Sequence, residues 1–136
     1  MNAWKNTLEW QWVPIDSIKP YGRPLRNRNR KAIEKLKKSI RHFGQVVPII
    51  VDDRREIVDG HAVWQAMREL DADEIAVVTV SGRSEAEIKA LRLALNRMAS
   101  DAAWNDEGLR LEFEDLLRLS FDLELTAFDT PEIDHV

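Results

Sequence analysis

The chain has 136 residues, of which 44% are hydrophobic and 32% are charged, so its composition is that of a folded domain rather than a disordered segment. It contains no cysteine, which excludes disulfides, thiolate nucleophiles and cysteine-based zinc sites. No apolar stretch approaches the roughly 20 residues that a membrane span requires, and the first residues do not lead into a secretory signal. We therefore expect a cytoplasmic protein without a membrane partner.

The charges are distributed unevenly along the chain. Ten of the twenty lysine and arginine residues lie between Lys19 and Arg41, where Glu34 is the only acid; this segment carries +9 and the remainder −13, giving the net charge of −4. A block of one sign indicates an anionic partner such as a nucleic acid or a nucleotide. The alternative is that later acidic helices fold back onto this segment. The residues predicted to bind DNA are Arg23, Arg26, Arg28, Arg30, Lys31, Lys35 and Lys38.

The first half of the chain predicts a strand, a loop and a helix. Leu8, Trp10 and Trp12 alternate with polar residues, which is typical of a half-buried strand, and Pro14 ends it. Residues 19–24 contain two prolines and a glycine and are predicted to form a loop. Hydrophobic residues then recur at three-and-four spacing from about 29 to 43, which predicts an amphipathic helix that Gly44 closes.

The second half alternates short strands with helices. The apolar runs 46–51 and 75–80 are rich in β-branched residues and predict strands covered on both faces. Between them we expect a short strand at 56–58 and a helix at 59–70. Ser84 and Glu87 form a capping box for a helix to about residue 99, and a further helix is predicted at 106–119. The fold class is therefore α/β (α+β), a small mixed sheet packed by helices, with additional C-terminal helices.

The C-terminus carries the start of one more helix. Thr130 is a suitable N-cap and Pro131 suits the first helical position, yet the sequence stops at Val136. We expect residues 1–100 to form the main domain and residues 101–136 to form a helical extension that leads into a missing C-terminal region. A short tail that docks onto the domain is the alternative.

The segment Asp59-Gly60-His61 lies where a strand is followed by a helix. The first N–H groups of that helix have no intrahelical acceptor, so they bind phosphate well, and Gly60 allows a ligand to approach the backbone. The alternative is that Asp59 is only an N-cap and His61 a surface residue. The three histidines, at 42, 61 and 135, show no ligand spacing, and no metal site is predicted.

Three stretches resemble the N-terminal domain of ParB, which belongs to the ParB/sulfiredoxin superfamily. They are VPIDSIKPY at 13–21, KLKKSIRHFGQVVPIIV at 35–51 and IVDGHAVWQA at 57–66. The later segments, which include Asn96-Arg97 and the stretch 123–129, are similar to the subgroup at the front of phage and bacterial DNA methylases. The resemblance implies a sulfiredoxin-like fold with a phosphate-binding cleft, which serves CTP, ATP or DNA in different members of the superfamily.

The resemblance also assigns residues to this cleft. Gly44, Gln45 and Pro48 correspond to the motif beside the nucleotide, and Asp59, Gly60 and His61 correspond to the phosphate turn. CTP or ATP, with Mg²⁺, are the implied cofactors. Partition proteins place arginines directly after the glycine turn, whereas this chain has Ala62 and Val63, which puts CTP hydrolysis in doubt. Arg23, Arg26 or Arg28 would supply the missing charge. The catalytic cysteine of sulfiredoxins has no counterpart.

Three functions follow from these patterns. The favoured one is a non-catalytic DNA- or nucleotide-binding module of a DNA-processing protein, either a modification methylase or a partition-type protein. The second is a nuclease or nucleotide hydrolase, in which His61 is the general acid or base and Asp59 orients it. The third is a protein-interaction domain that uses Trp4 and Trp104. A homodimer and a fused methyltransferase domain are further expected partners.

Overall fold

The structure, a computed structural model, describes residues 8–27 and 29–135. Trp4 and Arg28, which the sequence analysis singled out, lie outside the described residues. The elements in chain order are β1 (Trp10–Pro14), η1 (Ile15–Ser17), α1 (Arg30–Phe43), β2 (Ile49–Val51), β3 (Ile57–Asp59), α2 (His61–Glu69), β4 (Glu74–Thr79), α3 (Glu85–Ala99), α4 (Asp106–Arg118), η2 (Leu123–Thr126) and α5 (Thr130–His135).

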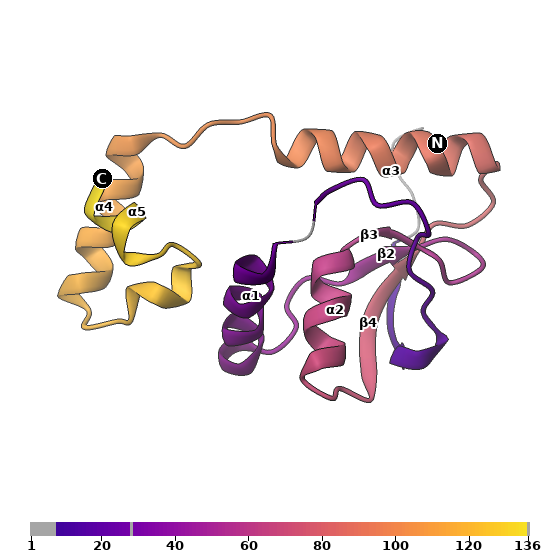
Figure 1. Ribbon diagram of the computed structural model, residues 1–136, viewed down its shortest axis with the longest axis horizontal. Helices are drawn as coiled ribbons and strands as arrows, with labels where there is room; N and C mark the ends of the chain where they lie inside the picture. Colours follow the sequence, from indigo (N-terminus) through magenta and orange to yellow (C-terminus); the bar gives the residue numbers. More distant parts are fainter. Residues whose placement is uncertain (1–7, 28, 136) are drawn as a thin grey trace.

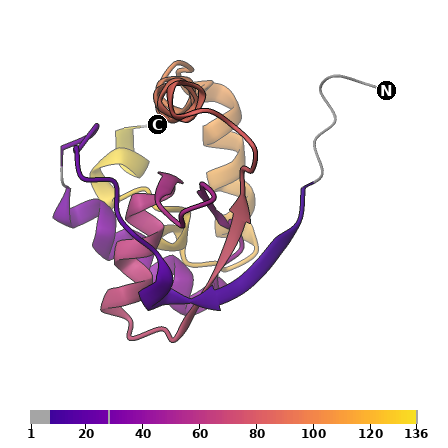
Figure 2. The ribbon, with the colours of Figure 1, turned by 90° about the vertical axis from the view of Figure 1, so that its right-hand side faces the viewer.

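The four strands form one mixed sheet in the order β1-β4-β2-β3 (Figure 1). β4 is antiparallel to β1 and parallel to β2, and β2 is antiparallel to β3. The outer edge of β3 is extended by Lys19, which bridges to Glu56. Figure 2 looks along the axis of α3, which contacts the edge strand β3, and shows this helix far from β1, the opposite edge strand. The predicted fold class, a small mixed sheet packed by helices, is confirmed.

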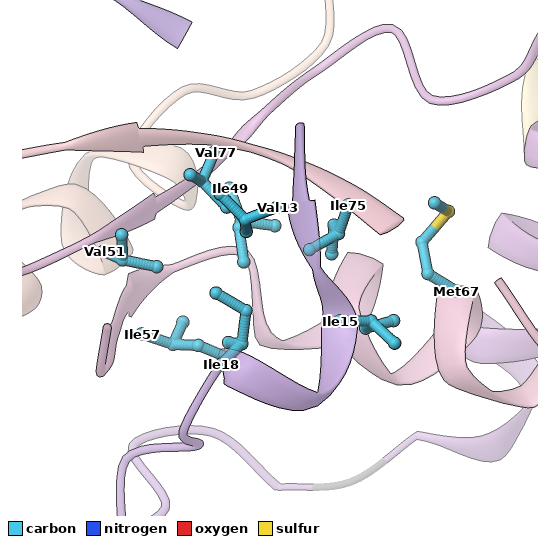
Figure 3. Packing of buried hydrophobic residues seen from close by; sticks show 9 residues of the cluster. All are labelled: Val13, Ile15, Ile18, Ile49, Val51, Ile57, Met67, Ile75 and Val77. Carbon is cyan, nitrogen blue, oxygen red and sulfur yellow. The ribbon is translucent and has the colours of Figure 1, made fainter. Parts of the chain in front are cut away.

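The core lies between the sheet and the helices α1 and α2. Aliphatic side chains from every strand meet there, and Ile49, Val51, Ile57, Ile75 and Val77 are at most 1% exposed. Met67 of α2 closes the cluster, with Ile40 of α1 packed against it (Figure 3). Each such side chain contributes roughly 1.5–3 kcal/mol by leaving water, so burial of these residues fixes the sheet.

Two predictions about the strands were wrong in detail. β2 begins at Ile49 rather than at residue 46, and Val46 and Val47 are 75% and 64% exposed. In β1 the alternation marks the wrong face, because Trp10 and Trp12 are 62% and 48% exposed while Val13 is buried. The exposure of both tryptophans shows that no described helix covers the face of the edge strand β1 that carries them.

The predicted helices are confirmed, and the first turns of α1, α3 and α4 are capped by side chains. Asn29, Ser84 and Asn105 accept hydrogen bonds from backbone N–H groups at the starts of α1, α3 and α4, and the capping box of Ser84 and Glu87 is complete. Such caps satisfy donors that the helix itself leaves free. Asp129, not Thr130, caps α5, since its carboxylate accepts from the N–H of Glu132.

The C-terminal helices lie beside α1 and away from the sheet (Figure 1). Residues 100–105 run from the end of α3 to the start of α4 without regular structure. α4, η2 and α5 then pack on one another around Phe113, whose ring lies 5.3 Å from the ring of Phe128. Among the described residues, no helix is long and apolar enough to cross a membrane.

Candidate functional site

Gly60 forms the turn between β3 and α2, and only glycine fits there. Its φ of 103° lies in the left-handed region, and a Cβ atom at this position would stand 2.6 Å from Cγ2 of Ile49. Because Ile49 follows Pro48 directly, this close packing brings the loop 44–48 against the turn 59–61. The structure thus places the two predicted cleft motifs side by side.

The N-terminus of α2 lacks a side-chain cap. Gly60 occupies the N-cap position and has no side chain to offer, in contrast to the capped starts of α1, α3 and α4. Asp59 is not the N-cap, because it lies in β3 and pairs with Ile50. The first N–H groups of α2 therefore remain available to an anion, and the helix dipole adds favourable potential there.

Gln45 holds the loop 44–48 onto the sheet. Its side-chain Oε1 accepts from the N–H of Ala76 at 2.8 Å, and its Nε2 donates to the carbonyl oxygens of Ala76 and Val47 at 3.0 and 3.1 Å. The Gln45 side chain thereby takes the place of a neighbouring strand beside Ala76 of β4, because β2 pairs with β4 only from Val77 onward. In this structure Gln45 positions the cleft loop, and its role toward a nucleotide stays a prediction.

His61 is fixed by the backbone of the loop that precedes α1. Its Nε2 accepts a hydrogen bond from the N–H of Tyr21 at 3.0 Å. Burial, reinforced by the positive charge of Arg92, lowers the pKa of His61 below its ordinary value. The lowered pKa favours the neutral imidazole, and because Nε2 accepts this hydrogen bond, the proton of the neutral ring belongs on Nδ1. Within the described residues no hydrogen bond links His61 to Asp59, so Tyr21 rather than Asp59 orients the ring.

Residues 19–26, which we call the strap, are clamped between the sheet and α3. The guanidinium of Arg92 lies 3.7 Å from the ring centroid of Tyr21, and Nζ of Lys89 donates to the Tyr21 hydroxyl at 3.0 Å. Arg92 is 3% exposed and donates to the carbonyl oxygen of Ile57 at 3.2 Å. The hydrogen bond from Lys89 lowers the pKa of Tyr21.

The far end of the strap is also bound to α3. Nε of Arg26 donates to Oδ1 of Asn96 at 3.1 Å, and Nδ2 of Asn96 donates to the carbonyl oxygen of Arg92 at 2.8 Å. Arg26 is therefore the loop arginine that the structure ties to α3. Arg23 forms no ion pair with any described residue. The sequence analysis did not predict that Arg92 holds the strap. Its spacing of four residues from Ile88 places both on the same face of α3, and this signal could have identified it.

Most basic residues of α1 are paired with acids. Arg30 and Lys37 both pair with Glu34 and Glu69. The other three lysines of α1 pair with acids from the C-terminal part of the chain. The hydrogen bond from Arg30 lowers the pKa of Glu69 to about 2. The alternative that later acidic segments fold back onto the basic region is therefore the arrangement observed. The pairs with the C-terminal part of the chain are Lys31–Asp129, Lys35–Asp129, Lys35–Glu132, Lys38–Asp122 and Lys38–Glu124.

Comparison with known families assigns both parts of the chain. Residues 2–96 match the model of the ParB N-terminal domain, and residues 107–136 match that of the ParB-methyltransferase HTH domain. The chain therefore belongs to the ParB N-terminal domain family, as the motifs indicated.

Two curated relatives are similar in sequence. The ParB-like nuclease domain-containing protein YnaK of Escherichia coli is 28% identical over 78 residues, which cover 57% of this chain and 90% of the relative. The probable chromosome-partitioning protein ParB of Pseudomonas putida is 31% identical over 123 residues, covering 87% of this chain and 40% of the relative. The chain thus spans well under half of that partition protein.

Solved structures share the fold. The C-terminally truncated ParB of Caulobacter crescentus, complexed with CTP-gamma-S, gives a TM-score of 0.70 at 20% identity and covers 88% of this chain and 69% of its own. A Pnob8-like ParB-N domain gives a TM-score of 0.59 at 23% identity; the match covers 83% of this chain and 46% of that domain's chain. Sulfiredoxin from Arabidopsis thaliana gives a TM-score of 0.51 at 22% identity; the match covers 61% of this chain and 96% of the sulfiredoxin chain. The ParB/sulfiredoxin fold predicted from the motifs is confirmed.

Proposed function

We propose that this chain is the DNA- or nucleotide-binding module of a DNA-processing protein, either a modification methylase or a partition-type protein. In this proposal, phosphate groups of the ligand bind at the Gly60 turn. The observation that carries it is the uncapped N-terminus of α2, whose free N–H groups adjoin the loop 44–48. Two facts about the Caulobacter relative support it, since that protein was solved with CTP-gamma-S and with the centromeric parS site.

The positive charge of the proposed site comes from the strap rather than from α2. Ala62 and Val63 occupy the positions where partition proteins carry arginines, and neither can pair with a phosphate. Arg26, held by Asn96, is the arginine we assign to this task. Of the two positions in α2, residue 62 is exposed whereas Val63 packs against the core, so only position 62 can accept an arginine without disturbing the fold.

Mg²⁺ belongs to this proposal only as a partner of a bound triphosphate. The described residues contain no cluster of three histidine, aspartate or glutamate side chains that could hold a metal ion. Phosphate oxygens and water would therefore supply most of its ligands. The proposal also includes a homodimer and a fused methyltransferase domain; light scattering with and without nucleotide tests the homodimer.

Calorimetric titration with CTP, ATP and a short DNA duplex, each at two salt concentrations, tests the proposed site. Wild type should bind at least one of them, with an affinity that falls as salt rises. Ala62→Arg should raise that affinity about tenfold, because a charge-assisted hydrogen bond to phosphate is roughly twice as strong as a neutral one. The matched control is Ala103→Arg, at an exposed position between α3 and α4. No binding of any of the three ligands, or an equal gain in both variants, would contradict the proposal.

A further inference from the structure

One face of α1 is covered by acidic residues from the end of the chain. We call residues 122–132 the acidic segment; it contains four carboxylates and no basic residue. Nζ of Lys35 lies 3.2 Å from Oε1 of Glu132, and Nζ of Lys38 lies 2.8 Å from Oε2 of Glu124. Lys31 pairs with Asp129. Each of these three lysines therefore faces at least one carboxylate of the acidic segment.

Among the described residues, one aromatic contact joins α1 to the C-terminal region. The rings of His42 and Phe121 meet edge to face with centroids 6.0 Å apart. The larger aromatic rings pack within the C-terminal region itself, since Phe128 contacts Trp104 at 5.1 Å. Ion pairs therefore supply the polar contacts that hold the acidic segment on α1, and such pairs are individually weak and screened by salt.

The three lysines form a row that suits a linear polyanion. Lys31, Lys35 and Lys38 are four and three residues apart, so they lie on one side of α1 over a length of about 10 Å. Duplex DNA carries one phosphate charge per roughly 1.7 Å of its axis, and a lysine that contacts a phosphate releases condensed counterions. The carboxylates of the acidic segment occupy the positions that DNA phosphates would take.

We propose that the lysine face of α1 is an interface shared by two alternative ligands. The acidic segment covers it in the free protein, and the phosphate backbone of duplex DNA displaces the segment. This inference rests on the proposed function, because it takes DNA as a ligand of the module. It adds that the C-terminal segment competes with DNA for Lys31, Lys35 and Lys38.

A double-mutant cycle in the full chain tests the competition. One variant neutralises the acids (Asp122→Asn, Glu124→Gln, Asp129→Asn, Glu132→Gln), a second neutralises the lysines (Lys31→Gln, Lys35→Gln, Lys38→Gln), and a third combines both sets. The affinity for a short duplex is measured by fluorescence anisotropy at low and physiological salt. We expect the acid variant to bind about tenfold more tightly than wild type, and the gain to vanish in the lysine-neutral background.

A charge-matched variant separates local competition from a general change in net charge. Asp101→Asn, Glu107→Gln, Glu112→Gln and Glu114→Gln remove the same number of acids from exposed positions, and none of these residues pairs with α1 among the described contacts. This variant should change the affinity less than about threefold, since charges beyond a Debye length are screened. Circular dichroism confirms that all variants are folded.

The outcomes separate this inference from the proposed function. Salt-dependent DNA binding that is equal in wild type and the acid variant overturns the inference and leaves the proposed function standing. A gain that persists without the lysines also overturns it, because DNA then binds elsewhere. If no variant binds DNA, the inference fails, while the nucleotide titrations of wild type and Ala62→Arg still decide the proposed function.

Discussion

The sheet region, residues 8–99, and the C-terminal region, residues 100–135, are held in place by different forces. Aliphatic side chains that are almost wholly inaccessible to water hold the first together. In the C-terminal region, Phe113 is the one buried side chain among those described, and ion pairs join this region to α1. Salt screens exposed ion pairs and so weakens them, whereas it does not screen the burial of apolar side chains.

This difference suits a binding module that its own chain regulates. The Gly60 turn and the strap belong to the region fixed by burial, so the proposed phosphate site is preorganised. In our proposal the acidic segment leaves α1 without unfolding the sheet, because the sheet is held together by its own buried side chains. The predictions below test this division, beginning with the largest expected effect.

Truncation in the sheet core should have the largest effect on stability. Ile57 is fully buried, so Ile57→Ala should lower the free energy of unfolding by about 3–5 kcal/mol through lost burial and the cavity left behind. Leu117 of α4 is 62% exposed, and Leu117→Ala should change it by less than about 0.5 kcal/mol. Urea denaturation measures both. Similar losses in the two variants would contradict the division between the regions.

Gly60→Ala should cause the second-largest loss of stability. The added Cβ meets Ile49 and the left-handed backbone is strained, so we expect a loss of about 2–4 kcal/mol. Gly22 is the matched control, because a Cβ there would have nothing within 4 Å and its φ is not positive. Thermal or urea unfolding distinguishes the two. A Gly60→Ala protein as stable as Gly22→Ala would mean that the turn packs differently.

Gln45→Leu should lower the free energy of unfolding by about 1–3 kcal/mol. The leucine cannot form the hydrogen bonds that the Gln45 side chain makes with the N–H and the carbonyl oxygen of Ala76. Gln11, which is exposed on the edge strand β1, provides the comparison, and Gln11→Leu should be close to neutral. Faster amide exchange at Ala76 in Gln45→Leu would verify the cause. Unchanged exchange would show that the side chain does not hold the loop.

The smallest effect concerns the acidic segment and its response to pH and salt. The hydrogen bond from Lys31 lowers the pKa of Asp129 to about 2. The stabilisation of the docked segment is therefore complete above the ordinary carboxyl value of about 3.9 and is lost as the pH falls through about 2. Roughly 1 M salt at neutral pH should weaken the same contact.

X-ray scattering measures this detachment as a rise in the radius of gyration. The lysine-neutral variant should already be expanded at neutral pH and low salt, and should respond little to either change. If wild type remained equally compact in high salt while its sheet stayed folded, apolar packing rather than charge would hold the C-terminal region.

Local sequence signals predicted most of the elements because they act over short distances. The capping box of Ser84 and Glu87 defined the start of α3, and the hydrophobic spacing defined α1. The prediction of which face of β1 is buried was wrong, because the alternation of apolar and polar residues does not reveal which face of an edge strand is covered. The late start of β2 was missed because the side chain of Gln45, not the backbone, pairs with β4 there.

The candidate site was predicted only in part. The glycine turn could be found because its sequence follows a strand and precedes a helix. The contacts that complete the site, from Tyr21 to His61 and from Arg26 to Asn96, join residues 40 and 70 positions apart, which no local pattern encodes. The pairing of the lysines with acids almost a hundred residues later is likewise a tertiary property.

The central claim is that the ligand's phosphates bind at the N-terminus of α2, and amide chemical shifts measured during a CTP titration test it most directly. We predict saturable shifts that are largest at the backbone amides of residues 60–63, with smaller ones in the loop 44–48 and at the side-chain amide of Asn96. Saturable shifts confined to α1, with none at the Gly60 turn, would contradict the account.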